Sequence, residues 1–338
     1  MLNIQVKKYK TLIYKSLIIM KRTIPFIITV CLIFGKTLLT FAQSSDINVS
    51  YEKGTDNSIT FNYEKRVPGS YTISVKLNNL QNASSSDYEG VINSNSGRLF
   101  TIKPIQRDQG ITFSYSYTYV RGNMNPKVDT SFIYVLPFKK GKKLKAIELS
   151  FIGKTYFKDV EPKNWKAYRF TSKLPDTVCA IRKGIVVKIE DKFQPDTSLS
   201  LDYTSKQNSI LIEHEDGSMA FYAGFLQNSF LVKEGDIVFP QANLGVLSKY
   251  DSNKNYNLSV QVYFFSKIKM SQYLEKSAGQ KLTKQQQFQE YINPTFLTSE
   301  GKTKLVPKKE YIAEINEETM IKEFTKREIK SYKKGNTK

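Results

Sequence analysis

Short runs that alternate apolar and polar residues recur between Asp46 and Leu136, with Gly, Asn, Ser and Pro between them. A period of two is typical of strands that bury one face, and the spacing is that of hairpins. The runs are INVSY, SITFNY, YTISVKL, RLFTI, ITFSYSYTY and SFIYVL. Together they predict a small β-sandwich over residues 46–140.

The run ITFSYSYTY carries an aromatic stripe. Alternation places Phe113, Tyr115 and Tyr117 on one face of this strand, and Ser114 and Ser116 on the other. We expect the stripe to form half of the sandwich core, as such stripes usually do. The alternative is a sugar-binding platform built on Tyr115 or Tyr117.

Strand-like runs return between Asp176 and Phe265: TVCAIRKGIVVKIED, NSILIEHEDG, SMAFYAGFL, LVKEGDIVF and LSVQVYFF. The pair Asp216 and Gly217 between two such runs predicts a hairpin with a type I′ turn. The segment PFKKGKKLKA, residues 137–146, holds five lysines and is typical of a solvated link. The chain is therefore predicted to be all-β, with a second β domain over residues 141–300.

Residues 301–338 are predicted to form a basic C-terminal tail with a short helix. The segment INEETMIKEFTKREIKSYKKG has its acids early and its bases late, which suits the helix dipole. Its apolar face is narrow, so we expect the helix to dock loosely on the domain.

Residues 1–42 have the features of a secretory signal peptide. They contain seven Lys or Arg and no acid, an apolar run, and small residues around Ala42. Met20, directly before Lys21 and Arg22, is an alternative start. A retained membrane anchor is the competing interpretation, but Pro25, Gly35 and Lys36 interrupt the apolar run. We expect cleavage, no integral membrane span in the mature chain, and a periplasmic or secreted location.

The net charge indicates the kind of partner, and the cysteine content excludes an internal disulfide. Loss of the seven charges in residues 1–42 from the net charge of +20 leaves +13. A basic exported chain favours anionic wall polymers or lipid headgroups, and nucleic acid is not an expected partner. Cys179 is then the one remaining cysteine, so no internal disulfide forms, and its apolar neighbours indicate a buried thiol.

Four segments follow one another in this region: PDTVCAIRKGIVVKI, ILIEHEDGSMAFYAGF, VKEGDIVFPQANLGVL and YNLSVQVYF. In this order and spacing they resemble the lysostaphin-type (LytM-type) zinc endopeptidases of metallopeptidase family 23, which cut peptide cross-links in peptidoglycan. The last three segments are similar to the strand and hairpin before the family's Y-x-H-L step, to its V-x-x-G-D-x-V segment and to its H-L-H-F strand. The resemblance implies a LytM-like barrel-sandwich hybrid domain, the duplicated hybrid motif. Lipoyl and biotinyl carriers share the VKEGDIVF turn, but they belong to intracellular complexes.

The resemblance does not extend to the zinc-binding and catalytic residues of that family. In the upstream stretch EPKNWKAYRFTSKLPDTVCA, Pro162 stands at the position of the zinc-binding His and Arg169 at that of the Asp. Asn257 and Ser259 occupy the two His positions of H-L-H-F, and Gly224 replaces the catalytic His of Y-x-H-L. A hydrolytic zinc site needs three protein ligands. We therefore expect no metal, no cofactor and a pseudo-enzyme.

His214 is the only histidine in the chain. It matches a histidine that the family often carries outside the metal site, which implies a structural role, with its ring satisfied by polar groups of the strand and turn. Other registrations would bring Asp159, Glu161 or Asp251 to the site as oxygen ligands.

The resemblance and the lost ligands imply an exported, non-catalytic homologue that binds peptidoglycan or an envelope protein such as a cell-wall hydrolase, for example as an amidase activator. Arg169 would be available for a carboxylate. One alternative is an active hydrolase with a rearranged site, using Ser259 or Cys179 with His214. Another is a structural envelope protein in which the sandwich does the work. The binding groove would be lined by Tyr222, Gly224, Asn257, Ser259 and Gln261.

Overall fold

The computed structural model describes residues 46–84, 87–149, 162–194, 206–250, 255–277 and 288–335. The expected signal peptide over residues 1–42 lies outside this range, as do Asp159, Glu161 and Asp251. In the described residues strands dominate, and the helices are short, which confirms the all-β prediction. The helices are α3 (Met270–Ser277), α5 (Glu317–Ile321) and α6 (Lys326–Lys333). No helix in this part of the chain is long and apolar enough to cross a membrane.

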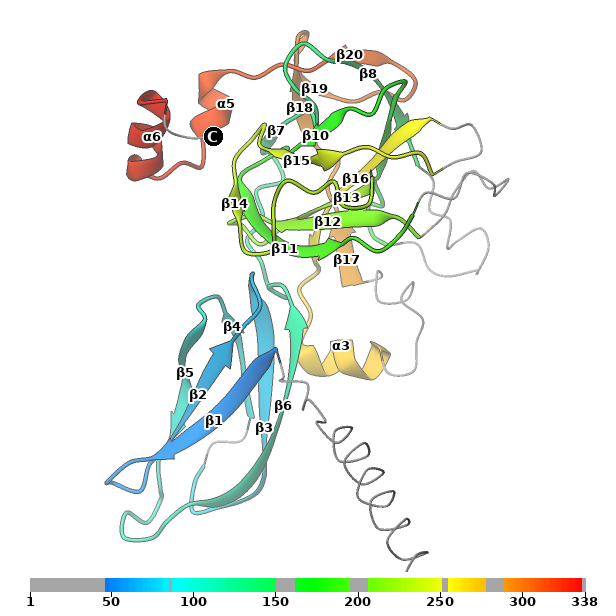
Figure 1. Ribbon diagram of the computed structural model, residues 1–338. Helices are drawn as coiled ribbons and strands as arrows, with labels where there is room; N and C mark the ends of the chain where they lie inside the picture. The colour runs from blue at the N-terminus through cyan, green and yellow to red at the C-terminus, as the bar shows by residue number, and fades with distance from the viewer. Residues whose placement is uncertain are drawn as a thin grey trace, which may run out of the picture. The chain divides into compact units, whose positions relative to one another are not determined.

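The N-terminal strands form two three-stranded sheets with a common core. The sheet orders are β1-β2-β5 and β4-β3-β6, shown in blue and cyan (Figure 1). The strands are β1 (Ile47–Lys53), β2 (Ile59–Lys65), β3 (Tyr71–Gln81), β4 (Asp87–Ile92), β5 (Ser96–Ile102) and β6 (Thr112–Arg121).

The aromatic stripe of β6 packs against this core, as expected. Phe113, Tyr115 and Tyr117 are half-buried against it. The Tyr115 hydroxyl donates a hydrogen bond to the Val49 carbonyl at 2.9 Å, and the Tyr117 hydroxyl donates to Ile47 at 3.2 Å. Because these hydroxyls hold β1 in place, the stripe is part of the sandwich and not an open platform.

One strand of the sandwich differs from the prediction. The run SFIYVL, expected as its last strand, contains β7 (Ile133–Val135), which pairs in parallel with β18 (Thr295–Thr298) in the second domain. The sixth strand of the sandwich is β4, whose sequence DYEGVI alternates weakly around Gly90. Tyr134 and Leu136 are fully buried in the core of the second domain, because that core offers SFIYVL the larger apolar surface.

A nine-stranded sheet dominates the second domain, in the order β14-β11-β12-β13-β16-β9-β8-β20, with β17 paired to β16. A two-stranded sheet, β10-β15, and a three-stranded sheet, β19-β18-β7, accompany it. Over the residues that the structure describes, no sheet closes into a barrel. The strands are β8 (Lys143–Glu148), β9 (Tyr168–Ser172), β10 (Thr177–Cys179), β11 (Gly184–Glu190), β12 (Asn208–Glu213), β13 (Met219–Phe225), β14 (Ile237–Val238), β15 (Asn243–Val246), β16 (Tyr256–Phe265), β17 (Gln289–Tyr291), β19 (Gly301–Lys304) and β20 (Glu310–Ile312).

The lysine-rich segment and the C-terminal tail both contribute strands to this domain. In β8, Leu144 and Ala146 are buried while Lys143 and Lys145 are exposed, so part of the segment expected as a link alternates as a sheet strand does. β20 pairs with β8 and buries Tyr311. The tail predicted over residues 301–338 therefore begins with strands and becomes helical only from Glu317 onward.

The hairpin at Asp216 and Gly217 forms as predicted, but with a different turn. Gly217 has φ of +83°, whereas Asp216 is not among the residues with positive φ, so the turn is not type I′. The Gly217 amide donates to the His214 carbonyl at 3.0 Å, and the His214 amide donates to the Ser218 carbonyl at 2.9 Å. This is a three-residue loop with glycine in the left-handed position. The Asp216 carboxylate accepts the Ser218 amide, which holds Asp216 in place.

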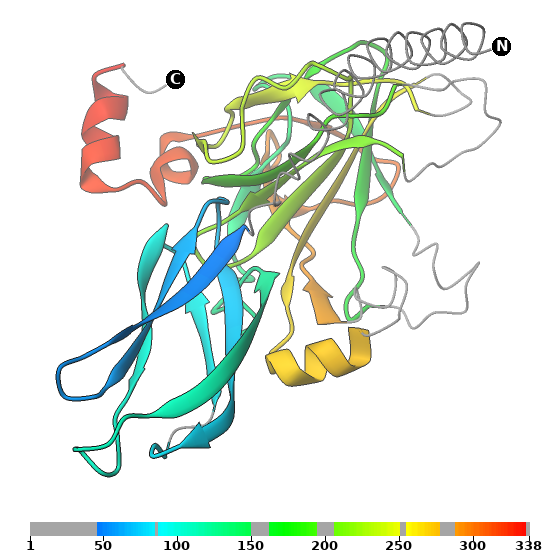
Figure 2. The ribbon, with the colours of Figure 1, turned by 60° about the horizontal axis from the view of Figure 1, so that its bottom comes forward.

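Contacts of the sandwich with the second domain centre on a buried carboxylate. The Glu213 side chain, at the end of β12, accepts hydrogen bonds from the amide and the hydroxyl of Ser70. Arg121 donates to the Val187 carbonyl at 2.7 Å. Helix α3 lies beside the β4-β3-β6 sheet (Figure 2), and the Met270 amide donates to the Glu89 carboxylate at 3.2 Å.

Candidate functional site

The central strands of the large sheet have one apolar face and one mixed face. On the apolar face, Tyr168, Phe170, Leu258 and Val260 are fully or almost fully buried in the core. Since side chains alternate along a strand, the residues between them point to the opposite side of the sheet. We call this side the outer face.

Register places three rows of side chains on the outer face. Directly paired residues of neighbouring strands share a face, so each row crosses several strands. The first row is Ile147, Arg169, Ser259, Ala223 and Ser209; the second is Lys145, Thr171 and Asn257; the third is Gln261, Phe221, Leu211 and Lys188.

Four of the residues predicted from the sequence come together on this face. Arg169 and Ser259 are direct register partners, and Asn257 and Gln261 lie two residues from Ser259 on the same strand. The Thr171 hydroxyl donates to the Asn257 side-chain oxygen at 2.9 Å and fixes its orientation. These side chains come from segments about 90 residues apart in sequence, which only the sheet brings together.

Tyr222 does not belong to this face. It is fully buried on the core side, and its hydroxyl accepts a hydrogen bond from the Ile181 amide at 3.0 Å. Burial raises the pKa of its hydroxyl. Because side chains alternate along a strand, Tyr222 points to the face opposite that of Ala223 and Ser259. The prediction that Tyr222 lines the same groove as Ser259 is therefore wrong. Pro162 lies before β9, where its carbonyl accepts the Trp165 amide at 3.2 Å.

Gly224 is held in a conformation that excludes a side chain. It lies at the irregularity where Phe225 pairs with Asn208 and Ala223 with Ser209, and its φ is +118°. A Cβ atom at this position would lie 2.1 Å from the Asn257 carbonyl oxygen. A histidine could therefore not be restored here without a shift of the backbone.

Arg169 is the notable charge of the outer face. It is half-buried, and its Nε is buried without a hydrogen-bond partner. Within the described residues its guanidinium forms no ion pair and no hydrogen bond. An unmatched donor in such a place is unusual, because buried polar groups are nearly always bonded.

The rows carry three cations, Lys145, Arg169 and Lys188, and two of the rows end in a carboxylate: Glu190 follows Ser209 in the first row, and Glu310 follows Lys145 in the second. Both carboxylates are paired with a nearby lysine. Glu190, opposite Ser209, binds Lys192 at 2.5 Å, and Glu310, opposite Lys145, binds Lys143 at 2.7 Å. As far as the structure describes this face, it is cationic.

Zinc, which the resemblance implies, does not fit these residues. No group of three or more His, Cys, Asp or Glu residues in the described part of the chain could hold a metal ion. The Arg169 guanidinium repels a cation, and Ser259 and Asn257 are neutral oxygen donors, which bind zinc poorly. No step through a metal follows from this face.

His214 and Cys179 are not placed to act as a base and a nucleophile. His214 is 2% exposed, and its Nδ1 lies 2.7 Å from the Lys183 carbonyl oxygen, which identifies Nδ1 as the protonated nitrogen. Burial, together with the charge of Arg182, lowers its pKa to about 3. Its Nε2 is buried without a hydrogen-bond partner, so only one of the two ring nitrogens is hydrogen-bonded as expected. Burial raises the pKa of the Cys179 thiol to about 11, which keeps it protonated.

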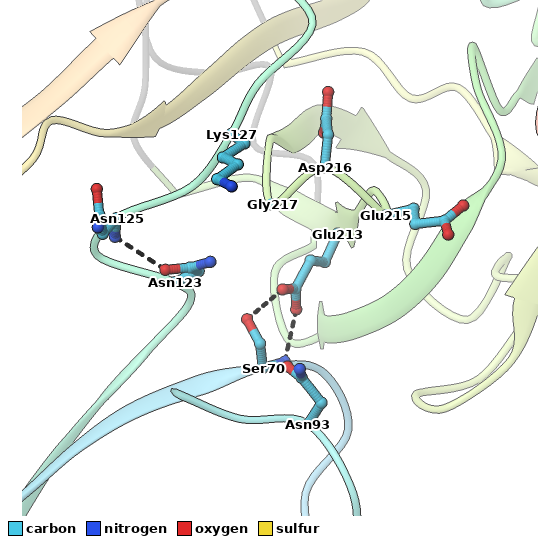
Figure 3. Close-up of a pocket in the computed structure, with 9 residues that line it drawn as sticks. All are labelled: Ser70, Asn93, Asn123, Asn125, Lys127, Glu213, Glu215, Asp216 and Gly217. Atoms are coloured by element: carbon cyan, nitrogen blue, oxygen red, sulfur yellow. Dashed lines mark hydrogen bonds between the residues drawn. The ribbon is translucent and has the colours of Figure 1, made fainter. Parts of the chain in front are cut away.

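A concavity of about 340 Å³ lies beside the Asp216 hairpin. In Figure 3 the Glu213 carboxylate points toward Ser70, and both of its oxygens are engaged there. Its hydrogen bonds make Glu213 part of the connection between the domains. The lining residues are Ser70, Asn93, Asn123, Asn125, Lys127, Glu213, Glu215, Asp216 and Gly217.

Comparison with known proteins gave matches among solved structures only. No family model matches the chain, and no curated protein does. A structure described as a glycyl-glycine endopeptidase LytM from Ruminococcus gnavus is 13% identical, with 40% of this chain and 53% of that chain covered and a TM-score of 0.27. This chain thus spans about half the length of that protein.

Two further structures are similar over parts of the chain. The catalytic domain of lysostaphin from Staphylococcus simulans is 20% identical, with 37% of this chain and 79% of that chain covered and a TM-score of 0.24. For the SpoIIQ–SpoIIIAH pore-forming complex the identity is 17%, the coverage 40% and 85%, and the TM-score 0.25.

Proposed function

We propose that this chain is an exported, non-catalytic homologue of peptidoglycan endopeptidases that binds the cell wall through its outer face. One observation carries the proposal. The residues at the family's metal and catalytic positions, Arg169, Asn257, Ser259 and Gly224, still meet at the outer face or its edge, yet they offer no metal ligand set. What these residues supply to a ligand is a guanidinium, an amide and a hydroxyl.

The location follows from the same proposal. The features of residues 1–42 support export to the periplasm or beyond, and the net charge of +13 that remains favours the anionic wall. Peptidoglycan supplies peptides and sugars, which hydroxyl, amide and guanidinium groups can hydrogen-bond.

A test uses the chain from Gln43 onward. Elemental analysis is expected to find no stoichiometric zinc, and incubation with purified peptidoglycan is expected to release no fragments. Pulldown on purified wall sacculi is expected to retain the protein at a salt concentration that releases a basic control protein of similar net charge. Bound zinc with cleavage would establish the alternative of an active peptidase and overturn the proposal.

The binding surface is tested with matched variants. Gln261→Trp would fill the outer face beside Ser259 with a bulky ring and is expected to weaken sacculus binding. Arg107→Gln removes a charge from an exposed loop of the sandwich and is expected to leave binding unchanged. A loss in Arg107→Gln with none in Gln261→Trp would show that binding is plain charge attraction. If sacculi retain neither the wild type nor the variants, the chain does not bind the wall, and a partner protein or a structural role is favoured instead.

A further inference from the structure

We infer that Arg169 is a binding subsite for a peptide carboxylate on the outer face. The inference rests on the proposed wall-binding function and names the chemical group that the face recognises. Three properties of the structure carry it: the unmatched guanidinium, the charge of its surroundings and the shape of its neighbours.

The unmatched guanidinium is clearest beside the other buried arginines. Arg121 donates to the carbonyls of Pro68 and Val187, and Arg182 donates to the carboxylates of Glu323 and Asp216. Arg169 has none of these partners among the described residues, although its Nε is cut off from water. The two Nη groups of Arg169 are not among the buried atoms and also lack a partner in the described residues, so they are the donors that a ligand carboxylate would reach.

The surroundings favour an anion over a cation or a neutral group. Lys145 stands in the neighbouring row, on the strand next to that of Arg169. Lys188 and Glu190 both lie on β11, four strands away from Arg169, which is roughly 19 Å at ordinary strand spacing, so their opposite charges act from a similar distance. Glu310 is two strands away but is already paired with Lys143. No described acid on the face competes with a ligand for Arg169.

The neighbours of Arg169 suit a planar group. Ile147 is its register partner on one side and Ser259 on the other, and the next position in the row is the small Ala223. A guanidinium beside one hydroxyl and flat apolar surface matches a carboxylate, which accepts two parallel N–H bonds and one further donor. A phosphate would expose more oxygens than these neighbours can satisfy. A free carboxylate of a peptidoglycan stem peptide has the required chemistry.

The experiment compares two forms of one synthetic stem pentapeptide, L-Ala-γ-D-Glu-L-Lys-D-Ala-D-Ala, with its carboxyl groups either free or fully amidated. Binding to the chain from Gln43 onward is measured by calorimetry. The wild type is expected to prefer the free acid by about ten- to a hundredfold, the usual effect of a charge-assisted pair. In Arg169→Gln the preference is expected to fall below about threefold.

Two controls separate charge from geometry. Arg107→Gln removes the same charge elsewhere and should keep the wild-type preference. Arg169→Lys keeps the charge but loses the planar fork, so it should restore only part of the preference. Because Arg169 has no partner in the described structure, its variants should unfold at the same temperature as wild type, and a circular dichroism melt confirms that each variant is folded.

The outcomes separate the two proposals. Equal binding of both peptides by a wild type that still binds sacculi would overturn the carboxylate subsite alone. A preference that persists in Arg169→Gln, or that falls equally in Arg107→Gln, would also overturn it. Failure to bind either peptide or sacculi would overturn the wall-binding function itself.

Discussion

Arg182 and Arg169 are both withdrawn from solvent, but the structure treats them in opposite ways. Arg182 is 2% exposed; its guanidinium lies 3.8 Å from the ring centroid of Phe132 and donates to Glu323 at 2.6 Å and to Asp216 at 3.0 Å. Arg169 has no such partners in the described residues. A buried cation with complete pairing holds a fold together, whereas an unpaired one at a surface is available to a ligand.

The Arg182 region joins segments that are distant in sequence. Asp216 belongs to the β12–β13 hairpin, and Glu323 lies between α5 and α6. Lys183 adds a contact to Glu328 at 2.7 Å, and the Phe324 ring lies 4.7 Å from that of Phe239. The C-terminal segment, which the sequence predicted to dock loosely, is thus held by buried charges and an aromatic pair.

The largest expected difference is in unfolding free energy, between a variant without the Arg182 side chain and one without the Arg169 side chain. Arg182→Met would leave Asp216 and Glu323 as poorly hydrated, unpaired carboxylates, which costs about 3 to 5 kcal/mol of unfolding free energy. Arg169→Met should change it by less than about 0.5 kcal/mol. Urea unfolding of both variants measures the difference, and equal losses would remove the distinction on which the comparison rests.

Gly224 tests whether the outer face has a structural requirement of its own. Gly224→Ala would add a Cβ atom 2.1 Å from a carbonyl oxygen at a φ of +118°, and should cost more than about 2 kcal/mol. Gly141→Ala is the matched control. Gly141 also has positive φ, but nothing lies within 4 Å of its Cβ position, so about 1 kcal/mol is expected. Similar losses in both variants would mean that the contact with Asn257 does not matter.

The pH dependence of stability should report on the Arg182 region through His214. The folded-state pKa of about 3 lies below the ordinary value of 6.5, so the unfolded chain binds the proton first. Stability is therefore complete above pH 6.5 and falls as the pH decreases toward 3, by on the order of 2 kcal/mol between pH 6.5 and 5.

Since the chain has one histidine, its proton NMR signal gives the titration directly. The signal should stay that of a neutral ring down to about pH 4. In His214→Gln the fall in stability between pH 6.5 and 5 should be much smaller. A histidine that titrates near pH 6.5 in the folded protein would contradict the buried, neutral ring.

A smaller effect is expected when the ion pair of Arg182 is weakened but not removed. Glu323→Gln keeps one hydrogen-bond acceptor for Arg182 and should cost about 1 to 2 kcal/mol. It should also increase amide hydrogen exchange around Phe324, because the segment between α5 and α6 loses its strongest attachment. Glu318→Gln, whose side chain is 79% exposed, should change neither measurement. Unchanged exchange in Glu323→Gln would show that aromatic contacts alone hold the segment.

Local patterns were sufficient for most strands and for the hairpin, but not for their assignment to sheets. SFIYVL is a clear strand pattern, and its apolar residues alone could not indicate which of two cores would bury it. PFKKGKKLKA was expected as a link because its lysines dominate the composition, although Leu144 and Ala146 alternate with them. The residue types at Arg169, Asn257 and Ser259, which carry neither imidazole nor carboxylate, were readable from the sequence, whereas the inward direction of Tyr222 required the register.

The sequence by itself determined that the chain is built of strands and that a hairpin turns at Gly217. These are local properties of alternation and turn chemistry. Only the tertiary structure decided that Arg182 is paired and Arg169 is not. Pairing depends on which distant segments meet, and Glu323 reaches Arg182 across 141 positions of sequence. Identical side chains thus differ in role because long-range packing, and not their own sequence neighbourhood, supplies or withholds a partner.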